Sequence, residues 1–311
     1  GTVTVQGATL NGNTISAFTS NVVIQLGTTP GAANSFAQID FQGLNLGAGN
    51  SLTLRSGAAG QAVVLRNATS AASAIDGTLQ AAGGNGAAPP VLHVANPAGI
   101  AVGAAGNVLG TSGLTLDALG ATPTTGQNVT NAGMVDGGPA LRLQGGNVKG
   151  GGAYKGDAIW LATFGSANNP VNGNYFLLNG LQLYPGTGGN VNLTLNAYGP
   201  APQFLNLKIN GNGTLWMPSA WPLGVTSPPN NNPLAPGAVR PPGTPEPAYG
   251  GGSMIVQATG SLLLVDGGTN DLAFPGAIVL KADGDLDLNG VVVNQGWTIT
   301  GKQFQGIFLE S

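Results

Sequence analysis

Apolar and polar residues alternate with a period of two along almost the whole chain. The clearest alternating segments are residues 2–5, 51–54, 114–116, 141–143, 181–183, 191–195 and 286–288. Such alternation places one set of side chains on a buried face and the other set in solvent, which predicts β-strands. No long segment carries apolar residues at the helical spacing i, i+3, i+4, i+7, so we expect almost no helix.

Turn-forming dipeptides separate these short segments. Asn-Gly or Asp-Gly pairs, which supply positive φ at low cost, stand at 11–12, 76–77, 136–137, 179–180, 210–211, 283–284 and 289–290. Many short strands joined in this way fit either an antiparallel sandwich or barrel, or a parallel β-helix. The irregular turn spacing, the Leu, Val, Ile and Ala at inward positions and an aromatic content of only 6% favour the parallel β-helix. At roughly 20 residues per rung, the chain would make about 15 rungs.

A Pro-rich segment at residues 218–249 breaks the alternation. Because Pro cannot donate to a strand ladder, we expect this segment to leave the coil as an extended arm that lies on the rod or on a neighbouring copy. The alternative is a mobile linker between domains. The chain then divides into a β-helix over residues 1–217, the arm, and further rungs or terminal strands over residues 250–311.

Aromatic residues bracket this arm, at Trp216, Trp221 and Tyr249. We expect them to pin the arm to the rod by burying ring area. The alternative is a platform that binds sugars or a partner.

Composition narrows the functional class. Of 311 residues, 54 are Gly, 42% are hydrophobic and only 7% are charged, which predicts a folded chain whose surface tolerates close association between copies. Nine Lys and Arg form no basic stripe, so we expect no nucleic-acid partner. There is no Cys, which excludes disulfides, and no apolar run approaches the about 20 residues that span a bilayer. Because the chain begins at Gly1 without a leader, we expect a processed or trimmed chain.

Candidate chemical groups are sparse. His93 is the only His and alternates with Leu92 and Val94, so we expect an ordinary surface residue. Three carboxylates stand at alternate positions, Asp283, Asp285 and Asp287, but the segment lacks the Gly and the bidentate Glu of a calcium loop. We therefore expect them to lie on a solvated strand face, and we expect no metal or cofactor. The other acids form no local cluster for acid–base chemistry. We therefore expect no enzyme, with a β-helical carbohydrate-active enzyme or a glycan- or receptor-binding module as the alternatives.

Three motifs follow one another between residues 43 and 119. They are Leu65-Arg66-Asn67, Ser73-Ala74-Ile75-Asp76-Gly77-Thr78-Leu79 and Asn96-Pro97-Ala98-Gly99-Ile100. Their order and spacing resemble the N-terminal two-partner-secretion (TpsA-type) domain of the filamentous haemagglutinin family. The matching positions are Ser73, Ile75, Gly77, Leu79, Asn96, Pro97, Gly99 and Ile100. Two positions depart from the family: Arg66-Asn67 inverts the usual order, and Ala98 replaces the second Asn of Asn-Pro-Asn-Gly-Ile.

The resemblance implies an all-β, right-handed parallel β-helix. It also implies secretion: the unfolded chain crosses an outer-membrane partner pore, folds outside, and serves as an adhesin or fibre at the bacterial cell surface. The residues of the Asn-Pro motif also favour a turn for local reasons. Pro97 fixes φ and forces Asn96 into an extended conformation. Gly99 can take positive φ, and Ile100 returns to the core. The matching residues therefore also suit a simple rung corner.

The two ends of the rod are the surfaces at which we expect self-association. An uncapped β-helix exposes unpaired strand edges at each end. The end segments 1–5 and 303–309 carry few charges, with Lys302 and Glu310 just outside the second segment. We therefore predict that copies associate head to tail into fibres, with host or matrix glycans as candidate further partners.

Overall fold

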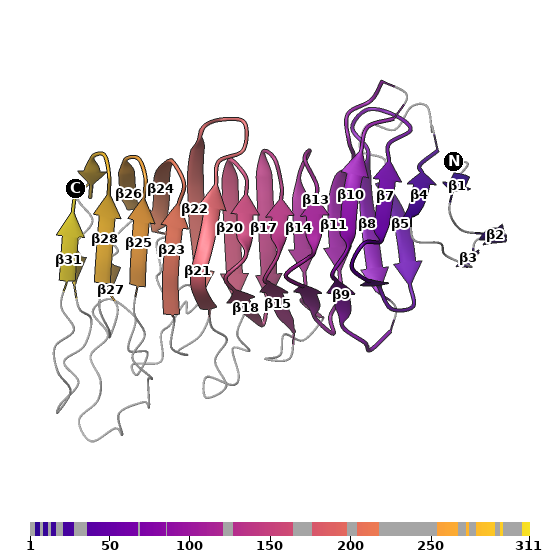
Figure 1. Cartoon of the computed structure of the whole chain (residues 1–311), viewed down its shortest axis with the longest axis horizontal. Coiled ribbons are helices and arrows are strands. Elements are labelled where there is room, and N and C mark those ends of the chain that lie inside the picture. Colours follow the sequence, from indigo (N-terminus) through magenta and orange to yellow (C-terminus); the bar gives the residue numbers. More distant parts are fainter. Residues whose placement is uncertain are drawn as a thin grey trace, which may run out of the picture.

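The computed structural model is an elongated rod of β-strands stacked side by side along one axis (Figure 1). The structure describes residues 4–6, 9–11, 14–16, 21–27, 36–67, 69–84, 86–120, 127–163, 176–197, 204–217, 254–266, 272–273, 278–289, 293–294 and 307–311. Every regular element in these ranges is a strand. The same residues contain no helix long and apolar enough to cross a membrane.

One face of the rod is a ten-stranded sheet whose neighbouring strands are all parallel. From the N-terminal end, its strands are β5 (Phe36–Phe41), β8 (Ala62–Asn67), β11 (Val91–Ala95), β14 (Leu114–Asp117), β17 (Ala140–Gly145), β20 (Ala158–Thr163), β22 (Asn190–Ala197), β24 (Asn212–Met217), β26 (Leu262–Asp266) and β29 (Leu286–Asp287). Leu92 pairs with Val63 on one side and with Leu114 on the other. Each turn of the coil therefore adds one strand to this sheet.

Two further columns of parallel strands belong to one 17-stranded sheet. The first column contains β6 (Asn45–Leu46), β9 (Ser73–Ile75), β12 (Ile100–Val102), β15 (Asn128–Asn131) and β18 (Asn147–Gly150). The second contains β4 (Asn21–Gln25), β7 (Ser51–Arg55), β10 (Thr78–Ala82), β13 (Asn107–Leu109), β16 (Met134–Asp136) and β19 (Ala153–Lys155). The long strand β21 (Phe176–Tyr184) pairs with both β18 and β19.

The coil continues through four more strands of this sheet: β23 (Phe204–Ile209), β25 (Met254–Ala258), β28 (Ile278–Ala282) and β31 (Ile307–Glu310). In the same part of the sequence, two short strands, β27 (Leu272–Ala273) and β30 (Val293–Asn294), pair in parallel with each other. The chain is thus an all-β, right-handed parallel β-helix. The alternation of apolar and polar residues and the family resemblance both predicted this fold class, and the prediction is confirmed.

Columns of Leu, Val and Ile fill the interior. Along the ten-stranded sheet, one inward column reads Val63, Leu92, Leu114, Leu141, Ile159, Leu193 and Leu215, each at most 2% exposed. Full burial of one such side chain stabilises the fold by about 1.5–3 kcal/mol. Tyr154 takes one place in the second column, between Val135 and Leu183, and its complete burial raises the pKa of its hydroxyl.

The described strands make fewer rungs than the estimate of about 15, and the rungs vary in length around the expected value of roughly 20 residues. The described sheet has ten strands, one per rung, and in the second column Leu52 pairs with Leu79 and Leu79 with Val108. Other rungs are shorter, since Leu141 pairs with Ile159 and Val135 with Tyr154. The estimate was wrong because some corner loops add residues to their rung without adding a strand.

The N-terminal end departs from parallel pairing. β1 (Thr4–Gln6) runs antiparallel to β4, and β2 (Thr9–Asn11) forms an antiparallel pair with β3 (Thr14–Ser16). β4 therefore already has a partner on its N-terminal side, and an antiparallel strand rather than a parallel rung ends this column.

The Pro-rich arm, with Trp221 and Tyr249, lies outside the described residues. β24 ends at Met217, and β25 begins the next turn at Met254 and pairs with β23. The backbone of Trp216 lies in β24, opposite Thr194 and Val265. The division of the chain at this segment stays a prediction, although the strands on both sides of it belong to one coil.

Candidate functional site

The Asn-Pro motif forms the corner at which the chain leaves β11 and enters β12. The Asn96 carbonyl oxygen accepts a hydrogen bond from Gly99 N at 2.9 Å, and its side-chain Oδ1 accepts one from Ala98 N at 2.9 Å. Gly99 has a φ of 114°, in the region that favours glycine. Ile100 follows directly and is 2% exposed. The four residues from Asn96 to Gly99 therefore make a tight turn that returns the chain to the core.

The side chain of Asn96 is fully buried and reaches into the preceding rung. Its Nδ2 donates to the Ala71 carbonyl at 3.0 Å and to Ser73 Oγ at 2.9 Å. Ser73 is 1% exposed, and its N–H donates to the Gly99 carbonyl at 2.9 Å. The first Ser of the Ser-x-Ile-x-Gly-x-Leu motif and the Asn-Pro turn are therefore bonded to each other, although they lie in different turns of the coil.

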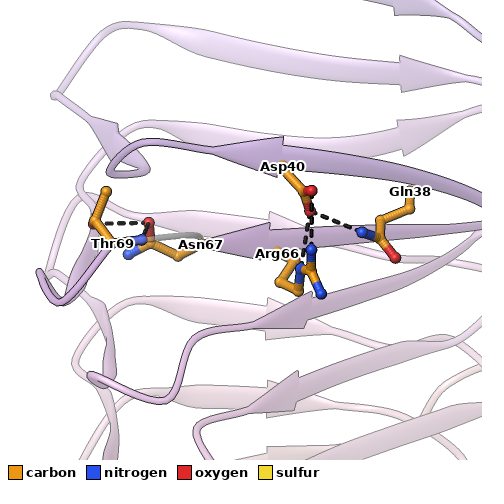
Figure 2. A network of polar contacts seen from close by, with 5 residues as sticks. All are labelled: Gln38, Asp40, Arg66, Asn67 and Thr69. Atoms are coloured by element: carbon orange, nitrogen blue, oxygen red, sulfur yellow. Dashed lines mark hydrogen bonds and ion pairs between the residues drawn. The ribbon is translucent and has the colours of Figure 1, made fainter.

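Asn67 occupies the same corner one rung earlier, because its neighbour Arg66 pairs with Ala95. Its Nδ2 donates to the same Ala71 carbonyl, and its Oδ1 accepts from Gly43 N at 3.0 Å and from Thr69 Oγ1 at 3.0 Å. Figure 2 shows Asn67 turned toward Thr69, away from the neighbouring Arg66. The Arg66-Asn67 order thus places the amide in the corner and the guanidinium on the outer face.

Arg66 is neutralised on the outer face of the sheet. Its Nε and Nη2 donate to the two carboxylate oxygens of Asp40 at 2.9 and 3.0 Å, and Gln38 donates to the same carboxylate (Figure 2). The hydrogen bond from Arg66 lowers the pKa of Asp40 and raises that of Arg66 itself. Both groups are solvent-exposed, so this pair contributes little to stability.

The remaining motif residues are explained by the packing of the rung. Ile75 and Leu79 are fully buried in the core. Gly77 lies against the previous turn, where a Cβ atom would stand 2.3 Å from the Asn50 carbonyl oxygen and 2.5 Å from that of Gly47. Only glycine fits at this position, because both neighbours are backbone atoms of the rung below.

A shallow depression of ≈ 570 Å³ opens beside this corner. Its lining residues are Arg66, Asn67, Thr69, Ser70, Pro97 and Ala98. The depression thus joins the two stretches in which the sequence departs from the family pattern, Arg66-Asn67 and Ala98. It offers the hydroxyl groups of Thr69 and Ser70 beside a guanidinium that Asp40 already neutralises.

Comparisons with known proteins bear on this fold. No family model matches the chain, and no curated protein matches it in sequence. Among solved structures, the chain is similar to the crystal structure of the HMW1 secretion domain from Haemophilus influenzae. The two chains align with a TM-score of 0.53 and 18% sequence identity, over 100% of this chain and 80% of that one. The two proteins share a fold. At 18% sequence identity, the similarity supports no statement about this chain beyond the shared fold.

The other candidate residues are not brought to the motif corner. His93 lies on the outer face of the ten-stranded sheet, where its Nε2 is 3.6 Å from Asp117 Oδ2. The three alternating carboxylates are exposed, at Asp283, Asp285 and Asp287. No group of three or more His, Asp or Glu within the described ranges could hold a metal ion.

The contact that joins the two turns was not predicted from the sequence. The Ala71 carbonyl accepts from both Asn67 and Asn96, and nothing in the type of residue at position 71 indicates this role. The signal that could have found it is the recurrence of Asn at the end of a strand in consecutive rungs. Recognising that recurrence requires the register of β8 against β11, which the sequence does not state.

Proposed function

We propose that this chain is exported by two-partner secretion and serves outside the cell as an adhesive, structural β-helix. In this proposal an outer-membrane pore carries the unfolded chain, which then folds at the bacterial surface. Two lines support it: the likeness in fold to a secretion domain, and the order of the motifs between residues 43 and 119.

The observation that carries the proposal is the bonding of Asn96 to Ser73. The two motifs that matched the family are far apart in sequence, yet their polar side chains meet at one buried corner at 2.9 Å. A parallel β-helix is stabilised mainly by contacts between neighbouring turns, so it can fold progressively from one end. Such folding suits a chain that emerges from a pore.

Export is tested by producing the chain behind a cleavable signal peptide, with and without an outer-membrane pore of this export class, and measuring the share of protein in the medium. We expect release that depends on the pore. Asn96→Ala should reduce release more than Asn107→Ala, because Asn107 makes only one exposed side-chain bond, to the Ala105 carbonyl. Equal release without the pore, or retention of the wild type in its presence, would overturn the proposal.

Self-association into fibres is the finer part of the proposal. Leu309 in β31 continues the inward column of Leu280, which is fully buried, yet Leu309 is 47% exposed. Within the described residues β31 pairs only with β28 and leaves one strand edge open. We propose that a second copy covers this end, since an open strand edge and an uncovered core column favour addition of another strand.

A further inference from the structure

A chain of polar and aromatic contacts crosses four consecutive rungs on the outer face of the ten-stranded sheet. His93 in β11 faces Asp117 in β14, whose carboxylate also receives a hydrogen bond from Gln144 in β17. Gln144 Oε1 in turn accepts from Arg142 Nε at 3.0 Å. The guanidinium carbon of Arg142 lies 3.8 Å from the ring centroid of Trp160 in β20.

Asp117 is already satisfied within this network. Burial acts to raise its pKa, but the His93 imidazole 3.6 Å away and the hydrogen bonds from the Leu119 N–H and the Gln144 side chain outweigh burial and hold the pKa below its usual value. The carboxylate therefore stays charged and bonded, and it does not serve as the counter-ion of Arg142.

Arg142 is held in position, and no Asp or Glu of the described residues forms an ion pair with it. Three other cations of the described chain, Arg66, Lys155 and Lys281, each pair with a carboxylate within 3.0 Å. Among the described residues the contacts of Arg142 are Gln144 and the Trp160 ring, and its side chain is exposed. A guanidinium whose plane is fixed by stacking, with its terminal N–H groups in solvent, presents the fork that binds a carboxylate in a bidentate manner.

Small side chains lie beside Arg142 on the outer face of the sheet. Ala140 and Ala158 precede Arg142 and Trp160 in the adjacent outward column, pair with each other, and are both exposed. Gly113 precedes β14 one rung earlier, where a Cβ atom would stand 3.3 Å from the side chain of the exposed Val91. A planar ligand can therefore lie against the sheet over this column while its charged group meets Arg142.

We propose that this face, centred on Arg142 and Trp160, binds a polysaccharide whose sugars carry carboxylate groups. A pyranose ring has an apolar face that fits the Ala column and hydroxyl groups that fit the amide of Gln144. Strands stand about 4.8 Å apart along the rod, a spacing close to the length of one sugar ring, so successive rungs face successive sugars.

An acidic peptide fits this face less well. Peptides bind sheets chiefly by adding a strand to an open edge, whereas the backbone of β17 is already paired with β14 and β20 on its two sides. The face therefore favours a ligand that lies flat on the outer side chains of the sheet over one that adds a strand.

Titration calorimetry with the purified full chain tests this inference, with oligogalacturonate as the probe and its methyl ester as the uncharged counterpart. We expect oligogalacturonate to bind and the methyl ester to bind at least about tenfold more weakly, because the ester cannot make the charge-assisted pair. Arg142→Gln should cause a similar loss. Arg142→Lys should recover only part of it, because an ammonium group lacks the fork and the stacking plane.

Arg66→Gln is the matched control, because it removes the same charge from the same sheet face at a residue that Asp40 already neutralises. It should leave binding unchanged. Circular dichroism spectra that match the wild type establish that each variant is folded. Equal loss in Arg66→Gln and Arg142→Gln, equal binding of the ester, or tighter binding of oligoglutamate than of oligogalacturonate would each overturn the inference. The assay uses folded protein, so its result is independent of the export proposal.

Discussion

Replacing Asn96 by Ala removes the side chain that ties two turns of the coil together. The change deletes the two bonds from Nδ2, to the Ala71 carbonyl and Ser73 Oγ, and the bond that Oδ1 accepts from Ala98 N. Asn96 is fully buried. Ser73 Oγ, which loses its partner, therefore stays in the interior, where water does not replace the missing bond.

The expected loss of stability follows from the number of hydrogen bonds that the substitution removes. A hydrogen bond contributes about 0.5–1.5 kcal/mol net, and a buried group left unsatisfied costs about 1–3 kcal/mol. The Ala71 carbonyl keeps its bond from Asn67, so the main losses fall on Ser73 and on Ala98 N. We therefore expect Asn96→Ala to lower the free energy of unfolding by about 3 kcal/mol, a large share of the about 5–15 kcal/mol typical of a folded domain.

Urea denaturation followed by far-UV circular dichroism measures this change. With a slope of about 3 kcal/mol per molar urea, the midpoint should fall by about 1 M. Asn107→Ala, at an exposed amide, should leave the midpoint almost unchanged. A loss below about 0.5 kcal/mol for Asn96→Ala, the size of an ordinary surface substitution, would refute the assignment of Asn96 as the tie between the rungs.

Asn96→Asp adds a test with a defined pH dependence. It keeps the acceptor for Ala98 N but turns a carboxylate oxygen toward the Ala71 carbonyl, so burial and repulsion raise the folded pKa of the new acid. The destabilisation should therefore be full above the folded pKa and should shrink as the pH falls toward the unfolded value of about 3.9. A stability gap to wild type that stays constant with pH would contradict this account.

Two further predictions concern the packing of the rungs and the open end of the rod. Gly77→Ala should lower the free energy of unfolding by about 3 kcal/mol, because overpacking against backbone atoms forces the rungs apart. Gly47→Ala should be nearly neutral, since its Cβ would meet only Asn50 Nδ2 at 3.5 Å. Equal urea midpoints for the two variants would contradict the steric argument. In sedimentation velocity, wild-type protein should form larger species as its concentration rises, and Leu309→Lys should suppress them. Val91→Lys, at an apolar residue 42% exposed on the side of the rod, should not, and association that survives Leu309→Lys would exclude docking at this end.

At the corner formed by the Asn-Pro motif, the sequence predicted the turn but not the depression beside it. The positions of Ser73, Asn96 and Gly99 came from the order of the motifs, and the expectation that Pro97 and Gly99 form a rung corner agrees with the turn that the structure describes. The depression beside the corner could not be predicted, because it lies between residues of two different rungs. Their distance in space depends on the register of the coil.

Local patterns in the sequence by themselves determined the fold class of this protein. Alternation with a period of two decides which side chains face the core, and Gly, Asn and Pro decide where the backbone turns; both effects act within a few residues. The number of rungs, the antiparallel β1, the shared bonds of Asn67 and Asn96, and the stacking of Arg142 on Trp160 were decided only by the tertiary structure. Each depends on which residues stand opposite one another in neighbouring turns. The lengths of the corner loops and the packing of the whole core set that register, and no local pattern encodes it.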